Sequence, residues 1–133
     1  PTRVVSGGSI TLDNTYTDVV VGLGYVSELE TMRLELPDRE GSSMGKVARI
    51  DHVALRVYNS FGGEIGPDIT HLDPMIMREA SDMMDSSPPV FTGDEKVSFA
   101  GPFQRQKVIV VRHDQPNSFN LLAMNVIGAT GMR

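Results

Sequence analysis

The sequence predicts an all-β domain, an antiparallel β-sandwich or barrel of about seven to eight strands with long connecting loops. Three observations lead to this prediction. Short segments rich in β-branched residues recur along the chain, several of them alternate apolar with polar side chains, and turns rich in Gly, Pro, Asn and Asp separate them. Short strands at such regular spacing are typical of sandwiches and barrels.

Length and composition favour a single domain spanning residues 1–133, because 40% hydrophobic and 22% charged residues are ordinary globular values. The chain begins with Pro1 rather than Met, so we expect it to be a fragment or a processed piece of a larger subunit. The absence of cysteine excludes disulfides and thiolate chemistry. No apolar stretch approaches the roughly 20 residues that span a bilayer, and we expect no membrane partner.

The first two expected strands are residues 9–12 and 17–25. In the second, apolar side chains alternate with glycines, which predicts one apolar face and a bare face that marks either a bulge or another backbone passing close. The apolar face consists of Val19, Val21, Leu23 and Tyr25, and the bare face of Gly22 and Gly24. Residues 26–36 fit a helical face as well as a strand, and we predict a strand. The Gly/Ser-rich segment 37–46 is predicted to be a flexible surface loop.

Residues 50–58 show the clearest strand pattern, with Val53, Leu55 and Val57 on one face. A turn rich in Gly, residues 59–63, follows, and residues 64–66 are expected to return as the next strand, ended by Pro67 and Asp68.

Residues 72–86 are ambiguous, because Asp73 and Pro74 resemble a helix start ahead of Met75 and Met77. On propensity alone this segment predicts a helix. Three more strands are expected at residues 96–99, 107–112 and 119–127. Turns are expected at 92–94, 101–102 and 114–117, where Gly, Pro, Asn and Asp gather.

None of the residues that could carry chemistry forms a recognisable catalytic or metal motif. The histidines with their neighbouring acids lack the compact spacing of a zinc site, and the serines lack a nucleophile elbow. Paired acids are the sole hint of a glycosidase, and residues 22–24 lack the third glycine of a phosphate loop. We therefore expect no enzyme activity, no metal and no cofactor. The residues weighed are His52, His71, His113, Asp51, Asp73, Asp114, Ser60, Ser98, Glu28, Glu30, Glu64 and Asp68.

Methionines gather in the second ambiguous segment, at Met75, Met77, Met83 and Met84. Thioethers adapt to irregular gaps, so we expect these side chains to fill the core or a subunit contact rather than to hold a cofactor.

Five ordered segments are similar to a known family: residues 19–25, 29–32, 59–68, 91–94 and 112–116. Their order and spacing resemble the C-terminal part of phage tail tubular protein B, the nozzle subunit of short-tailed bacteriophages, and related prophage proteins. The resemblance covers roughly residues 4–126. It departs at residues 103–106, where the family pattern has a Trp-Asp-Arg-Asp-Gly-like turn, and in the Met-rich segment. The residues that carry it are Gly22, Leu23, Tyr25, Asn59, Gly62, Gly63, Gly66, Pro67, Asp68, Phe91, Gly93, Asp94, Asp114, Gln115 and Pro116.

The resemblance implies a virion structural protein, made in the bacterial cytoplasm and built into the phage tail. It implies a homo-oligomer, a hexameric ring in the full subunit, with other phage tail subunits as partners and a channel for DNA ejection. The net charge of −5 disfavours DNA binding as a main activity, so DNA passage without sequence-specific binding is the expectation. The resemblance also implies extended structure in residues 72–86, which we adopt over the helix.

In this interpretation the matched residues shape the backbone. Gly62 and Gly63 would permit a tight hairpin, and the pair 93–94 would set a turn before Lys96.

Two other functions use the same fold. A carbohydrate-binding sandwich for host-surface attachment would present Tyr16, Tyr25 or Tyr58 to sugars, but aromatic residues make up only 6% of the chain and Trp is absent. A cell-wall hydrolase would need Glu28 or Glu64. The structural tail domain is the preferred hypothesis.

Overall fold

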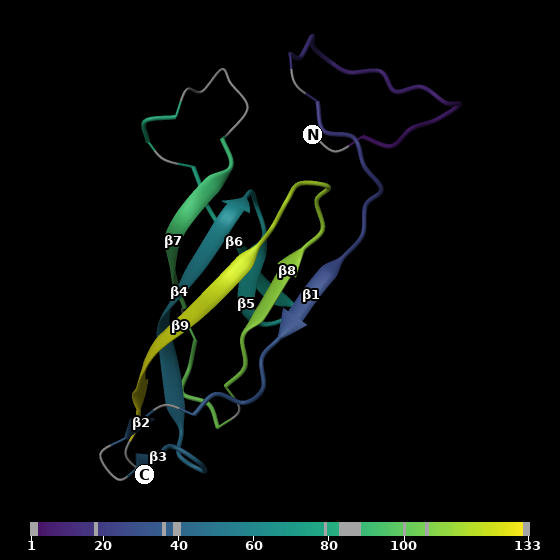
Figure 1. Cartoon of the computed structure of the whole chain (residues 1–133). Helices are drawn as coiled ribbons and strands as arrows, with labels where there is room; N and C mark the ends of the chain where they lie inside the picture. Colours follow the sequence, from purple (N-terminus) through teal and green to yellow (C-terminus); the bar gives the residue numbers. More distant parts are fainter. Residues whose placement is uncertain are drawn as a thin grey trace.

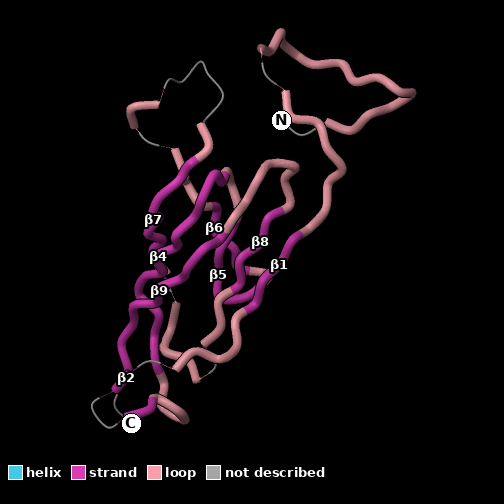
Figure 2. Tube along the Cα trace, viewed as in Figure 1, coloured by secondary structure: helices cyan, strands magenta, loops and turns pink. Residues whose placement is uncertain are grey.

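The structure, a computed structural model, describes residues 3–17, 19–35, 37–38, 41–78, 80–82, 89–99, 101–105 and 107–131. These residues contain strands and no helix, and two antiparallel sheets pack face to face as a sandwich rather than closing into a barrel (Figure 1, Figure 2). The prediction of an all-β sandwich is confirmed.

The smaller sheet has three strands in the order β7 (Phe91–Ser98), β4 (Ala48–Ser60) and β9 (Leu121–Thr130). The larger sheet has four, in the order β1 (Ser27–Glu30), β8 (Val110–His113), β5 (Glu64–Asp68) and β6 (His71–Pro74). A two-residue pair, β2 (Pro37–Asp38) with β3 (Gly41–Ser42), interrupts the predicted loop 37–46, of which residues 39 and 40 lie outside the described part.

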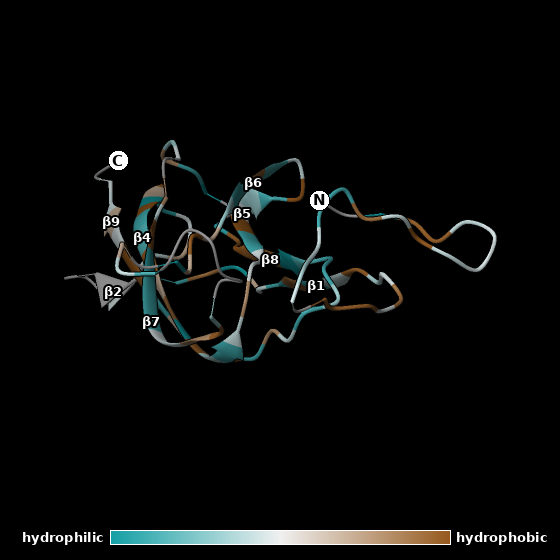
Figure 3. Cartoon of the chain, turned by 90° about the horizontal axis from the view of Figure 1, so that it is seen from above, coloured by the Kyte–Doolittle hydropathy of each residue, from teal (hydrophilic) through white to brown (hydrophobic). Residues whose placement is uncertain are grey.

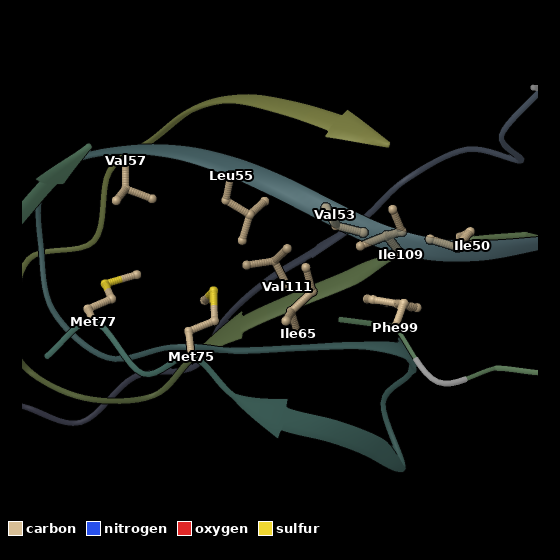
Figure 4. Packing of buried hydrophobic residues seen from close by; sticks show 10 residues of the cluster. All are labelled: Ile50, Val53, Leu55, Val57, Ile65, Met75, Met77, Phe99, Ile109 and Val111. Atoms are coloured by element: carbon tan, nitrogen blue, oxygen red, sulfur yellow. The ribbon is translucent and has the colours of Figure 1, made fainter. Parts of the chain in front are cut away.

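The core lies between the sheets and is built from the apolar face of β4. Val53, Leu55 and Val57 are fully buried, as their alternation predicted, and they point toward Ile65 of β5 and Val111 of β8 (Figure 4). Burying one such side chain contributes roughly 1.5–3 kcal/mol, so this face of β4 is the main stabilising contact of the sandwich. Ile50, also of β4, and four residues outside the strands complete the cluster: Met75, Met77, Phe99 and Ile109.

The chain before β1 is not a strand, so the prediction for residues 9–12 and 17–25 is wrong. It is coil with one isolated bridge, between Ser6 and Ser9, and residue 18 lies outside the described part. Figure 1 shows this segment leaving the sandwich from β1. A strand requires a hydrogen-bonded neighbour, and the other described strands do not lie beside it.

The predicted hairpin at residues 59–63 is also wrong. β4 and β5 do not pair with each other: β4 pairs with β7 and β9, and β5 pairs with β6 and β8. The turn therefore carries the chain from one sheet to the other. Its backbone has positive φ at Asn59 (46°), Gly62 (70°) and Gly63 (101°), a conformation that glycine and asparagine adopt most readily.

The turn predicted at residues 92–94 lies inside β7, so that prediction is wrong. Gly93 pairs with Val57 and Asp94 with Arg56 across the β4/β7 ladder. The Asp94 carboxylate accepts two hydrogen bonds from Arg56, from Nε at 2.6 Å and from Nη2 at 2.7 Å. This ion pair joins the two strands at a sequence that is typical of turns, next to the irregularity in the ladder between Val57 and Ser60.

Residues 71–78 are extended, as β6 followed by coil, so the helix suggested by propensity is wrong here and the extended interpretation is confirmed for this part. Residue 79 and residues 83–88, including Met83 and Met84, lie outside the described part. Met75 and Met77 are buried in the core rather than in a subunit contact.

The remaining strand predictions hold with shifted bounds. β7 begins five residues before the predicted start at residue 96, β8 is confined to the second half of 107–112 plus His113, and β9 runs on to Thr130. Pro67 and Asp68 are the last two residues of β5. Residues 114–117 form the predicted bend between β8 and β9.

Candidate functional site

Two loops from different sheets meet at one end of the sandwich, at the top of Figure 1. We call residues 59–63 and 114–120 together the loop end. The Phe61 N–H donates to the Ser118 carbonyl at 3.0 Å, and the Ser118 hydroxyl donates to the Asn59 carbonyl at 2.6 Å. The Asn59 N–H donates to Thr92 Oγ1 at 2.9 Å. Hydrogen bonds thus tie the loop end together and join it to β7.

Three motif glycines lie in close contact with other residues at the loop end. A Cβ at Gly63 would lie 2.6 Å from Met75 Cε and 3.0 Å from the Phe119 ring, and its φ of 101° adds backbone strain for any other residue. A Cβ at Gly22 would lie 2.9 Å from Pro116 Cβ, so segment 19–25 also reaches the loop end. Gln115 lies against Gly62 in the same way. This end of the sandwich brings together residues from four of the five segments.

Two buried polar residues, Ser60 and His113, lie at or next to the loop end. Ser60 Oγ donates to the Tyr58 carbonyl at 2.9 Å and accepts the Asn120 N–H at 2.8 Å, so this serine is engaged on both sides. His113 is 4% exposed and stacks on Phe119 with ring centroids 5.2 Å apart. Its Nε2 is buried without a hydrogen-bond partner, and the adjacent Asp114 is exposed.

The other histidines belong to separate strands: His52 lies on β4 and His71 on β6. In the part of the chain that the structure describes, no three His, Asp or Glu side chains gather closely enough to hold a metal ion. Ser98 lies opposite His52 in the β4/β7 pair, but among the described contacts no hydrogen bond joins the two side chains, and His52 Nδ1 is buried without a partner.

A separate group of polar side chains forms the turn between β5 and β6. Asp68 accepts hydrogen bonds from the Thr70 hydroxyl and from the Thr70 N–H at 2.8 Å, and His71 Nδ1 lies 2.9 Å from the same carboxylate. The Thr70 hydroxyl, then His71, then the Thr70 N–H lower the pKa of Asp68 to about 2. Such a carboxylate is ionised and a weak base, and its bonds close the turn on itself.

A hollow of about 500 Å³ opens beside this turn and is lined by Pro67, Leu72, Phe99, Pro102 and Gln104 among others. The acid pairs do not build a glycosidase there. Glu64 and Asp68 are the first and last residues of β5, so at about 3.3 Å per residue their Cα atoms stand roughly 13 Å apart. The two carboxyl groups of a glycosidase lie ~5–9.5 Å apart. Glu28 and Glu30 lie on the exposed edge strand β1.

The segment before β1, residues 3–17 and 19–26, carries the most exposed apolar side chains; we call it the arm. Leu23 is 92% exposed and Val21 78%. Figure 3 shows the arm projecting from the sandwich with apolar stretches along it. Further exposed members are Val4, Val5, Ile10, Leu12, Tyr16, Val19, Val20, Tyr25 and Val26.

Neither the known family models nor the curated proteins gave a match to this chain.

The predicted site residues therefore divide into four places: the loop end, β5, β7 and the arm. Gly22, Asn59, Gly62, Gln115 and Pro116 meet at or against the loop end, together with Gly63. Gly66, Pro67 and Asp68 lie in β5, and Phe91, Gly93 and Asp94 in β7.

Leu23 and Tyr25 lie in the exposed arm. The alternation of apolar residues in 19–25 signalled this surface, but it suggested a paired strand of the same domain. The described residues include no helix that is long and apolar enough to cross a membrane.

Proposed function

We propose that this chain is a structural, non-enzymatic domain of a bacteriophage tail subunit of the nozzle type. It assembles with copies of itself, as a ring of six in the full subunit, and with other tail subunits. The observation that carries the proposal is the arm, a run of apolar side chains left open to solvent beside a well-packed sandwich. Exposed apolar surface of this extent is typical of protein–protein contacts.

The packing of the loop end supports the same proposal. The segments that resemble the tail family contribute glycines and turn residues to a close-packed junction, and this is a shape-defining role rather than a chemical one. Several of the polar groups described above make structural hydrogen bonds, as at Ser60 and Asp68, whereas one ring nitrogen each of His52 and His113 is buried without a partner. A domain built in this way contributes a rigid body and contact surfaces to an assembly.

The net charge of −5 suits a wall past which DNA slides, because an acidic surface does not retain phosphates. In this proposal the domain supports DNA ejection without reading sequence.

The test is the location of the full subunit in phage particles. Particles of the phage that encodes the chain are purified on a density gradient, and gold-labelled antibodies raised against the domain mark its position. A non-packaged enzyme of the same phage serves as the control for carry-over. We expect peptides of this chain in the particles at a fixed ratio to the other tail proteins, and gold at the tail. Recovery only in the soluble fraction contradicts the proposal.

A glycan array probed with the purified domain distinguishes the carbohydrate-binding alternative. Silence is the expected result. Specific binding that disappears when Tyr58 is replaced by Ala would favour the alternative, since Tyr58 is an exposed ring on the sandwich itself.

A further inference from the structure

We propose that residues 19–26 of the arm pair with the free edge of β9 in a second copy of this chain. The inference deepens the proposed assembly role and rests on it for the expectation that copies meet. It names the two surfaces that form the contact, and it is carried by the charge pattern of the edges, the exposure of the arm and the incomplete cover of the core beside β9.

The four sheet edges differ in how well they are protected against pairing. An edge strand has unpaired backbone groups that can hydrogen-bond to a strand of another chain. Charged side chains, prolines and a short strand length prevent such pairing. β1 has four residues with Glu28 and Glu30, β6 has four residues ending in Pro74, and β7 carries three consecutive charged residues, 94–96. β9 has ten residues with no charge and no proline, so it is the one unprotected edge among the described strands.

The core is also thinly covered on the side of β9. Several apolar side chains pack against the core but are only partly buried. Four of them come from residues 119–126: Phe119, Leu121, Met124 and Val126. On β9, Met124 and Val126 alternate with the exposed residues Asn125 and Ile127. A strand added beside β9 with one apolar face would extend the sheet and cover Met124 and Val126.

Segment 19–26 of the arm has that composition. It is eight residues long, has no charged residue, and spans roughly 26 Å when extended, against roughly 33 Å for β9. Pairing would place an uncharged strand beside an uncharged edge, whereas every other edge would set it against charged side chains or proline.

The arm is held so that its apolar face turns away from its own sandwich. The missing side chain of Gly22 leaves room for Pro116 of the same chain, which is the close approach described at the loop end. Neighbouring positions point to the opposite side of an extended chain, and Val21 and Leu23 are 78% and 92% exposed. Figure 1 and Figure 3 both show the arm leaving the sandwich rather than lying along β9 of the same chain.

The contact joins two different surfaces, because the arm precedes the larger sheet and β9 is an edge of the smaller one. Repetition of such a head-to-tail contact gives a closed ring or a filament unless two copies exchange arms reciprocally. A ring is the arrangement that the proposed function requires.

The first experiment uses engineered cysteines, which are unambiguous since the chain contains none. One protein carries Val21→Cys or Leu23→Cys, another carries Met124→Cys or Val126→Cys, and the two are mixed and oxidised with copper–phenanthroline. We expect a disulfide-linked dimer of two 14.5 kDa chains in at least one arm and β9 mixture. The matched control is Ile69→Cys, an exposed aliphatic position at the β5–β6 turn, which should not link to the arm.

The second experiment measures association by sedimentation equilibrium. The unmodified chain should gain average mass with concentration, and Leu23→Asp should raise the dissociation constant about tenfold or more, the loss expected for one buried apolar anchor. Ile127→Lys, a charge on the β9 edge, should act in the same direction, and Ile69→Asp should not.

Three results would overturn the inference. They are a chain that stays monomeric at all concentrations, association that Leu23→Asp leaves unchanged, and a Leu23→Cys/Val126→Cys double variant that links only within one chain.

These outcomes are separable from failure of the proposed function. A monomeric domain whose full subunit is nevertheless present in phage tails removes the arm contact alone. Arm-dependent association of a protein that is absent from particles removes the tail assignment alone.

Discussion

Replacing Gly66 by Ala should destabilise the sandwich more than any other single methyl added at a motif glycine. A Cβ at this position would lie 1.8 Å from the His71 carbonyl oxygen and 3.0 Å from Leu72 Cα. Both are backbone atoms of the β5–β6 pair and cannot rotate aside, so the two strands must move apart. The ladder here is already irregular between Ile65 and Asp68, and little slack remains.

Overpacking by one methyl group costs about 1–3 kcal/mol, and contact with two backbone atoms places this substitution near or above 3 kcal/mol. Domains of this size have a free energy of unfolding of about 5–15 kcal/mol, so the loss is a large fraction of the total. With a urea m-value of roughly 1–3 kcal/mol/M, the midpoint of urea unfolding should fall by about 1–3 M.

The assay is urea unfolding followed by far-ultraviolet circular dichroism, with Gly24→Ala as the matched control. A methyl group at Gly24 would have no other atom within 4 Å, and this glycine also belongs to one of the five segments. Its replacement should leave the midpoint unchanged. Equal midpoints for the two variants would refute the packing explanation of the motif glycines.

Three smaller predictions concern the core, the β5–β6 turn and metals. Leu55→Ala should cost about 2–5 kcal/mol in urea unfolding, because Leu55 is fully buried, whereas Leu122→Ala at an exposed position should stay within about 0.5 kcal/mol. The Asp68 carboxyl should titrate near pH 2 by NMR, below its usual pKa of 3.8, and Thr70→Val should raise that midpoint. The stability that the ionised Asp68 adds to the fold is present above the usual pKa and is lost as pH falls from about 4 toward 2. An Asp68 midpoint of 3.8 in the unmodified chain would contradict the turn geometry. Zinc or a chelator should leave the melting temperature unchanged, since the described residues hold no metal-binding cluster, and a rise of several degrees with zinc would contradict this.

The sequence was sufficient to predict the centre of the fold. In β4 the alternation that places Val53, Leu55 and Val57 on one face required no knowledge of the partners, because a half-buried strand must hide one face. The same rule misled at residues 17–25, which have the alternation of a strand. Alternation identifies the side chains that form an apolar face, and the surface that buries this face can belong to another chain.

The glycine-rich turn sequence predicted the backbone conformation of residues 59–63 correctly, but it did not predict which strands pair on either side of the turn. Gly62 and Gly63 have the positive φ that their sequence predicted, but they lead into the other sheet, because a tight turn does not determine whether the next strand pairs or crosses over. Gly93 and Asp94 have the sequence of a turn and lie in β7, where Asp94 forms an ion pair with Arg56 of β4. Close approaches such as Gly22 to Pro116 join residues far apart in sequence, so they required the structure.

The most direct test of the proposed tail role is a cryo-electron microscopy map of an assembled phage tail that contains this chain. We predict a ring of copies at the distal end, each with two packed sheets and no helix in the described ranges. We also predict density that leaves β1 of one copy and runs along β9 of the next. A tail map without this sandwich, or one in which the domain encloses a bound substrate instead of contacting neighbours, would contradict the account.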